Sequence, residues 1–300
     1  MRRLSDEVTQ ACSARRLRKT WTGHPSVPTR IRMHRERAAA QASAHFRTRA
    51  SCASLSLVVM ALAGCASSRG GIEATPTSQA TERTVELGHS VQGRPIRMHV
   101  FEGRGEPVLV LAGFHGNEPT GVDLANTLLA HLRTVPVANA GHRVAVVPAV
   151  NPDGLARRER TNANGVDINR NFPASNWSGR TSSGRTHGGA SPGCEPETQA
   201  VMTAVHMTAP ARILSIHSIA RGRHCNNYDG PAAAIAHAMA AANGYPVRAT
   251  MGYATPGSFG TWAGVDRNIP TVTLELPRDL PGEQCWAQNR EALLTFIQHK

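Results

Sequence analysis

The sequence predicts a single α/β domain with a mixed, largely parallel central sheet flanked by helices. Short apolar runs typical of buried strands recur through residues 82–300, and stretches with helical spacing of apolar residues separate them. This alternation favours a sheet with helices packed on its faces. The chain of 300 residues shows no internal repeat and no sign of a second domain.

Four apolar runs are expected to form strands. The first reads VLVLA, and such an uninterrupted, β-branched run is typical of a strand that is buried on both faces. The four expected strands are 108–112, 144–150, 213–217 and 271–276.

Four further stretches are expected to be helices. In the first, Ala125, Leu128 and Leu132 follow one another at helical spacing. The four expected helices are 120–132, 196–206, 232–243 and 287–298. Residues 151–195, in contrast, have little periodicity and are rich in Asn, Gly, Ser and Arg, which predicts binding or catalytic loops.

The net charge of +12 first suggests a nucleic-acid or anionic-lipid partner. However, twelve of the basic residues but only three acidic residues lie within residues 1–64, so most of the excess is outside the predicted domain. The folded part lacks a basic face interleaved with aromatic residues. We therefore expect no nucleic-acid partner.

The excess charge precedes a short apolar run, ASLSLVVMALAG, at residues 53–64. This run has the length of a signal-peptide core and is shorter than the roughly 20 residues that span a bilayer. It ends in LAGC at Cys65, which resembles the lipobox of bacterial lipoproteins. We expect residues 1–64 to be a leader with a lipoprotein signal peptide, and Met33 is an alternative translation start.

Cys65 is then the predicted lipid-attachment residue, and it opens a flexible linker rich in small and polar residues over 65–81. The catalytic domain is expected over 82–300. The resemblance implies a periplasmic protein attached to a membrane by the lipid on Cys65. Ala66, which follows, is compatible with sorting to the outer membrane.

Export would leave three cysteines in the folded part: Cys194, Cys225 and Cys285. Two of them can form a disulfide in an oxidising compartment. We expect a bond between Cys194 and Cys225, because both lie in irregular segments near the candidate site.

Histidines and a glutamate follow two of the predicted strands. His115 and Glu118 occur in GFHGNE after the first strand, and His217 ends the third strand. The carboxyl ends of parallel strands meet at one edge of a sheet, and two His with one Glu form a zinc site that leaves a position open for water. The alternative is a surface His115, a helix-start Glu118 and a packed His217.

Glu275 lies within the apolar strand run TVTLELP. Burying an unpaired carboxylate is unfavourable, so this residue should either form an ion pair, for example with Arg278, or face a polar cavity. In the second case it is well suited to act as a general base.

Six short motifs, in order GFHGNE, NPDG, RTN, GVDINRNFP, SIHS and TLELP, resemble those of the zinc metallocarboxypeptidases of the carboxypeptidase A type. The resemblance spans about residues 84–300. It is closest to the small bacterial murein peptide amidase A branch of that family.

This resemblance implies one zinc ion per chain, held by His115, Glu118 and His217. It implies that Glu275 is the general base and then the general acid. Asp167 would accept a hydrogen bond from the second ring nitrogen of His115, which fixes the orientation of the ring.

The resemblance also implies residues that bind the substrate. Arg160 would stabilise the oxyanion that forms as water attacks. Asn169 and Arg170 would bind the terminal carboxylate of the substrate. Tyr253 is the candidate for the family's lid tyrosine, although the PGSFGTW stretch after it does not align with the family pattern.

The expected function is hydrolysis of an amide next to a C-terminal residue. The lead substrate is the γ-D-glutamyl–diaminopimelate bond of peptidoglycan-derived (murein) peptides in the cell envelope. One alternative is an aspartoacylase-like deacylase of N-acyl amino acids, and another is a lipoprotein that binds murein peptides without cleaving them. No residue was identified that would recognise the side chain next to the scissile bond.

Overall fold

The computed structural model describes residues 82–179 and 187–299. The predicted leader, the LAGC motif with Cys65 and the predicted linker lie outside these residues. None of the helices in the described ranges has the length and apolar character needed to cross a membrane.

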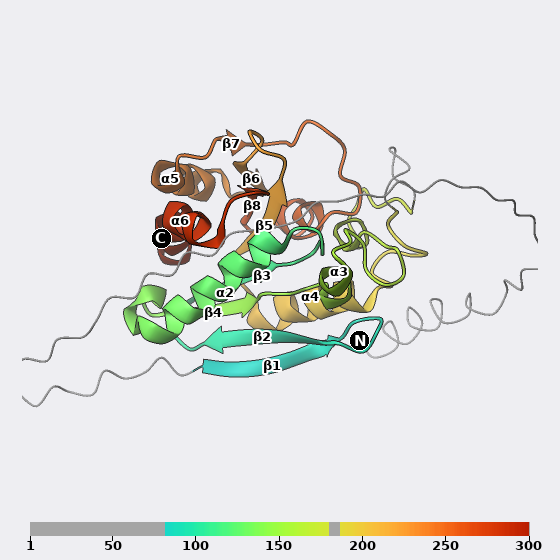
Figure 1. Cartoon of the computed structure of the whole chain (residues 1–300), viewed down its shortest axis with the longest axis horizontal. Coiled ribbons are helices and arrows are strands. Elements are labelled where there is room, and N and C mark those ends of the chain that lie inside the picture. Colours follow the sequence, from blue (N-terminus) through green and yellow to red (C-terminus); the bar gives the residue numbers. More distant parts are fainter. Residues whose placement is uncertain (1–81, 180–186, 300) are drawn as a thin grey trace, which may run out of the picture. The chain divides into compact units, whose positions relative to one another are not determined.

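The described residues form an eight-stranded sheet in the order β1-β2-β4-β3-β5-β8-β6-β7 (Figure 1). The strands are β1 (Glu82–His89), β2 (Pro95–Phe101), β3 (Gly105–Ala112), β4 (His142–Val147), β5 (Arg212–Ile219), β6 (Cys225–Asp229), β7 (Val247–Arg248) and β8 (Thr271–Pro277). Strands β4, β3, β5 and β8 are parallel, whereas β1, β2 and β6 each pair antiparallel with a neighbour. The predicted mixed, largely parallel sheet is therefore confirmed.

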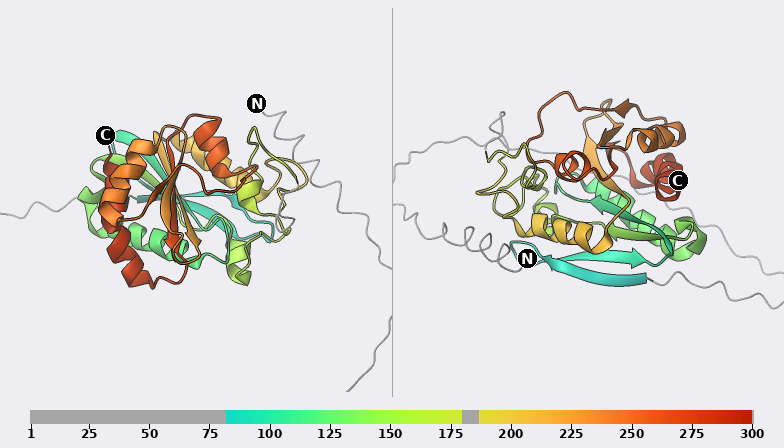
Figure 2. Two further views of the ribbon diagram at one scale, coloured as in Figure 1. Left: turned by 90° about the horizontal axis from the view of Figure 1, so that it is seen from above. Right: turned by 180° about the vertical axis from the view of Figure 1, so that it is seen from behind.

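Helices cover both faces of this sheet (Figure 2). They are α2 (Pro119–Thr134), α3 (Pro152–Arg157), α4 (Pro196–Thr208), α5 (Ala233–Asn243) and α6 (Gly282–Gln298), with short helical turns η1 (Pro136–Asn139), η2 (Ile168–Arg170) and η3 (Thr261–Val265). One apolar core joins α2, α5 and α6 to one face of the sheet, and a second joins α4 and η3 to the other.

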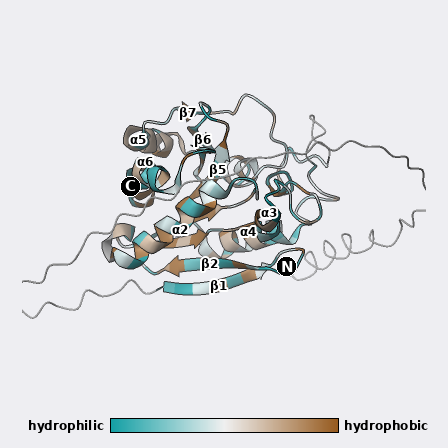
Figure 3. Cartoon of the chain, viewed as in Figure 1, coloured by the Kyte–Doolittle hydropathy of each residue, from teal (hydrophilic) through white to brown (hydrophobic). Residues whose placement is uncertain are grey.

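All four predicted strands and all four predicted helices are present, within a few residues of their expected ends. The β1–β2 hairpin and strands β6 and β7 were not predicted from the sequence. Hydrophobic residues dominate the central strands in Figure 3, whereas β1 is mostly hydrophilic. Its half-exposed position at the edge of the sheet explains why apolar patterning did not reveal it.

The strand register brings the functional side chains to one face. His217 of β5 is paired with Glu275 of β8, which is paired in turn with Cys225 of β6. Because side chains alternate along a strand, Leu274 and Leu276 enter the core under α5 and α6 while Glu275 faces the opposite side. His217 and Glu275 therefore emerge beside each other at the carboxyl ends of adjacent parallel strands.

The long loop after β4 is fixed by buried hydrogen bonds. The Asn151 side chain accepts from Gly154 N at 2.8 Å and donates to Phe114 O at 3.2 Å, which joins the NPDG segment to the turn that carries His115. These segments are so close that a Cβ at position 116 would overlap the backbone of Gly154, so only glycine fits there.

The hairpin missed by the sequence analysis also supports this loop. Both carboxylate oxygens of buried Asp153 are bound by its turn, one by the Ser90 hydroxyl at 2.8 Å and the other by Gln92 N at 2.9 Å. Asn162, further along the loop, donates to both Glu195 and Glu197 at the start of α4. The loop is therefore held between the hairpin and α4.

Candidate active site

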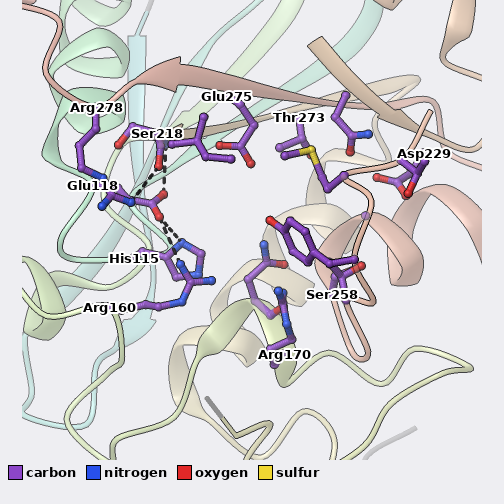
Figure 4. Close-up of a pocket in the computed structure, with 18 of the residues that line it drawn as sticks. His115, Glu118, Arg160, Arg170, Ser218, Asp229, Ser258, Thr273, Glu275 and Arg278 are labelled. Atoms are coloured by element: carbon purple, nitrogen blue, oxygen red, sulfur yellow. Dashed lines mark hydrogen bonds and ion pairs between the residues drawn. The ribbon is translucent and has the colours of Figure 1, made fainter. Parts of the chain in front are cut away.

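Three buried side chains meet at the carboxyl end of the sheet. His115 Nδ1 lies 3.0 Å from Glu118 Oε1, His217 Nδ1 lies 3.1 Å from Glu118 Oε2, and the two Nδ1 atoms are 3.3 Å apart. The side chains of His115 and Glu118 converge in this way in Figure 4. Ser218 N also donates to Glu118 Oε2, at 3.1 Å, which fixes the orientation of the carboxylate.

The chemistry of this donor set fits a divalent cation. His115 Nε2 lies 3.0 Å from Asp167 Oδ1, and an imidazole that donates from Nε2 presents a lone pair at Nδ1. That lone pair faces a carboxylate and a second ring nitrogen. Ligands about 2.0–2.1 Å from tetrahedral zinc lie roughly 3.3 Å from one another, close to the spacing of these three atoms.

The electrostatics of the cluster also favour positive charge. Burial alone would lower the pKa of His115, but the carboxylates of Glu118 and Asp167 outweigh it and raise that pKa. Burial alone would raise the pKa of Glu118, yet the adjacent imidazoles hold it well below its usual range. Asp167 behaves in the same way, since the charges of His115, Arg160 and Arg170 overcome its burial and lower its pKa.

The carboxylate of Glu275 faces the same pocket and makes no hydrogen bond or ion pair with any described residue. The alternative ion pair with Arg278 is not formed, because Arg278 instead donates to Ser218 O at 3.5 Å. Burial raises the pKa of Glu275, the Glu118 charge adds to this rise, and His217 opposes it. A carboxylate that is ready to accept a proton therefore lies beside the His/Glu/His cluster.

Arg160 lies against the cluster from the loop side. Its Nε donates to Asp167 Oδ2 at 2.9 Å, and its Nη1 donates to Glu118 Oε1 at 3.3 Å. The guanidinium also lines the pocket. These bonds hold a positive charge beside the His/Glu/His cluster.

Asn169 and Arg170 both line the pocket, and Figure 4 shows Arg170 across it from Arg278. Phe259 N donates to Asn169 Oδ1 at 2.8 Å, so the amide presents its NH₂ group to the pocket. The buried Arg170 guanidinium donates to Asn169 O. Tyr253, which is 50% exposed, lies in the segment between β7 and η3 and also lines the pocket.

The pocket contains a third carboxylate, for which the sequence predicted no role. Asp229, at the end of β6, lies on the far side of the pocket from Glu118 (Figure 4). No hydrogen bond or ion pair links its carboxylate to another described residue, and burial raises the pKa of that carboxylate. Thr273 of β8 lies between Asp229 and Glu275. The CNNYD segment shows no apolar alternation, so it gave no local signal that Asp229 ends a strand.

The structure corrects the disulfide expected between Cys194 and Cys225, since the two sulfurs are not bonded to each other. Cys194 precedes α4, where its thiol donates to Glu195 at 3.4 Å. Cys225 lies at the start of β6, with its sulfur 3.9 Å from Met251 Sδ. The two residues thus have different neighbours, although both lie close to segments that build the site.

The fold and the site together define a metal-dependent hydrolase of the α/β class, with a polar pocket that joins a cation-binding cluster to a potential general base. The sequence profile of the zinc carboxypeptidases matches residues 76–282, and the chain belongs to this family. The family implies zinc as the metal, and His115, Glu118 and His217 form the only such cluster found among the described residues.

Several known proteins are similar to the chain. Murein peptide amidase A of Escherichia coli (strain K12) is 36% identical over 210 residues, which cover 65% of this chain and 81% of that protein. Murein peptide amidase A of Vibrio campbellii is 30% identical over 241 residues, which cover 75% of this chain and 88% of that protein.

Two solved structures are also similar to the chain. The crystal structure of murein-tripeptide amidase from Escherichia coli O157 matches with a TM-score of 0.57 and 31% identity, over 72% of this chain and 92% of that one. Bovine thrombin-activatable fibrinolysis inhibitor matches with a TM-score of 0.62 and 18% identity, over 73% of this chain and 90% of that one, which shows the shared fold.

Proposed function

We propose that the protein hydrolyses the γ-D-glutamyl–diaminopimelate amide bond of murein peptides. The observation that carries this proposal is that the unpaired carboxylate of Glu275 lines one pocket together with His115 and Glu118 of the cluster and with Asn169 and Arg170. The names of the two murein peptide amidases that match the chain support this choice of substrate.

Different residues of the pocket would bind different parts of such a substrate. Arg170 and the Asn169 amide would bind the carboxylate of the C-terminal residue, because a guanidinium and an NH₂ group both donate to it. The preceding carbonyl would then lie near the cluster. Arg160 would donate to the oxygen of that carbonyl as negative charge develops on it.

Proton transfer is assigned to Glu275. Zinc bound by His115, Glu118 and His217 would polarise the scissile carbonyl and lower the pKa of a water molecule. Glu275 takes a proton from the attacking water and later gives it to the nitrogen of the departing amine. Its raised pKa suits both roles, since the same carboxyl group must accept and then release the proton.

Asp229 supports diaminopimelate as the departing residue. The side chain of diaminopimelate ends in an ammonium group as well as a carboxylate. A partly buried carboxylate without a protein partner gains most from a ligand that supplies positive charge. The far wall of the pocket is therefore suited to an amine-bearing side chain rather than an apolar one.

A purified mature chain incubated with L-alanyl-γ-D-glutamyl-meso-diaminopimelate tests the reaction. We expect release of diaminopimelate that is lost with a chelator and restored by zinc. Glu275→Gln should lower kcat by at least about 100-fold while the zinc content is retained. Glu283→Gln, on the exposed face of α6, serves as the matched control.

Three results would contradict the proposal. Appreciable hydrolysis by Glu275→Gln would remove the assigned base. Release only from N-acyl amino acids would identify a deacylase. Metal-independent binding of the tripeptide without turnover would identify a binding protein.

We further propose that the enzyme acts in the periplasm, attached by lipid on Cys65 to the outer membrane after removal of residues 1–64, with 65–81 as the linker. The LAGC motif after a short apolar run supports this proposal. Mass spectrometry of the membrane-derived N-terminal peptide should detect an acylated Cys65. An unmodified peptide that begins before Cys65 would contradict the proposal.

A further inference from the structure

Arg278 occupies a fixed position beside the cation-binding cluster. Its backbone N–H donates to Ile219 O at 2.9 Å, and its carbonyl accepts from Thr120 Oγ1 at 2.9 Å. Ile219 and Thr120 each follow a proposed zinc ligand by two residues. The main chain of Arg278 is therefore tied to both segments that carry these ligands.

The side chain of Arg278 lines the pocket with an unneutralised charge. Its Nη2 lies 3.5 Å from Ser218 O, and no carboxylate of the described residues lies within ion-pair distance. Arg160, in contrast, is paired with both Asp167 and Glu118. The guanidinium of Arg278 is thus available to a ligand at this side of the pocket.

Arg278 also lies on the opposite side of the pocket from the groups that would hold the departing residue. In Figure 4 it extends from the side of Ser218 and Glu118, whereas Arg170 and Asp229 lie across the pocket. A substrate whose C-terminal residue contacts Arg170 and Asp229 must extend its acyl part the other way. That part passes Arg278.

We propose that Arg278 binds a carboxylate on the acyl side of the scissile amide and thereby selects γ-linked acidic residues. A γ-linked glutamyl group carries a free α-carboxylate near the scissile carbonyl, whereas an ordinary α-linked residue has a neutral peptide group next to that carbonyl. A guanidinium forms strong, charge-assisted hydrogen bonds with such a carboxylate. This inference rests on the proposed function and assigns the recognition of the γ linkage to one residue.

Two matched peptides test the inference. One is L-alanyl-γ-D-glutamyl-meso-diaminopimelate, and the other carries an amide in place of the glutamyl α-carboxylate. The full mature chain should have a kcat/KM about tenfold or more higher for the carboxylate peptide. Arg278→Gln should abolish this preference by slowing hydrolysis of the carboxylate peptide, while hydrolysis of the amide peptide changes less than about twofold.

Two further variants support the interpretation. Arg278→Lys keeps the charge without the planar fork and should retain an intermediate preference. Arg290→Gln, which removes an exposed guanidinium that is paired with Glu291, should keep the full preference. The unaltered chain is also assayed with both peptides. The test therefore does not depend on the folding of any variant.

The outcomes distinguish this inference from the proposed function. The inference is overturned if the unaltered chain hydrolyses both peptides equally, or if Arg278→Gln slows hydrolysis of both equally. In either case Arg278 does not recognise the α-carboxylate, and the proposed function still stands. If the unaltered chain hydrolyses neither peptide, the proposed function fails and the inference fails with it.

Discussion

The two ends of the pocket differ in how their polar atoms are satisfied. At the cluster end, Glu118 is held by both imidazoles, Ser218 N and Arg160, and Asp167 supports His115 from behind. At the far end, the carboxylate of Asp229 has no hydrogen-bond or ion-pair partner among the described residues. The first end is organised in advance for an ion, whereas the second keeps an unsatisfied charge for which a ligand can supply the partner.

The largest expected effect is at the cluster end. His217→Ala removes one of three proposed ligands, so bound zinc should fall towards zero and amide hydrolysis by at least about 1,000-fold. Metal analysis together with the tripeptide assay measures both effects. His206→Ala, on the exposed side of α4, is the control and should keep both. Zinc binding that survives His217→Ala would remove His217 from the ligand set.

A smaller effect is expected behind the cluster. Asp167→Asn weakens the acceptor for His115 Nε2, so the affinity for zinc should fall by about 10-fold to 100-fold. Competition with a chromophoric chelator measures this affinity. Hydrolysis at saturating zinc should change less than the affinity does. An unchanged affinity would show that Asp167 does not orient the ligand.

At the far end, Asp229→Asn should lower kcat/KM for the diaminopimelate tripeptide by about tenfold to thirtyfold. The same peptide with alanine as its last residue should be little affected, because it has no ammonium group to lose. Asp279→Asn, which alters an exposed carboxyl group, is the control. An equal loss of kcat/KM for both peptides would mean that Asp229 maintains the structure of the pocket and does not bind the side chain of the last residue.

The smallest expected effect is a pH dependence of that preference. Burial raises the pKa of Asp229, so on acidification this carboxylate becomes protonated at a higher pH than an exposed one. The ionised form binds an ammonium group, and the preference for diaminopimelate over alanine should therefore be full above the raised pKa and decline below it. Ratios of kcat/KM measured between about pH 4 and about pH 8 test this, and Asp229→Asn should show no such decline.

The same contrast explains what could be predicted from the sequence. His115 and His217 were identifiable because each follows an apolar run that could only be a buried strand, and the edges of parallel strands coincide. Glu275 had two possible environments, and only the register with His217 distinguished between them. The residues at the cluster end could therefore be predicted largely from local sequence patterns.

The residues at the far end could not be predicted from such local patterns. Strand β6 reads CNNYD, which has no apolar alternation, and it becomes a strand through its antiparallel pairing with β8. Asp229 is consequently indistinguishable from a loop aspartate until that pairing is known. The predicted Cys194–Cys225 disulfide is wrong for the same reason, since two irregular segments near one site do not by themselves bring their cysteines together.

Gly260, just before η3, has a consequence for how this enzyme can evolve. A Cβ at this position would overlap the carboxylate of Asp229, so any other amino acid would displace that carboxylate. A substitution at this position would move the carboxylate at the far end of the pocket and leave the residues of the His/Glu/His cluster unchanged. If Asp229 binds the departing residue as proposed, one mutation at Gly260 can change the substrate specificity without loss of the metal site.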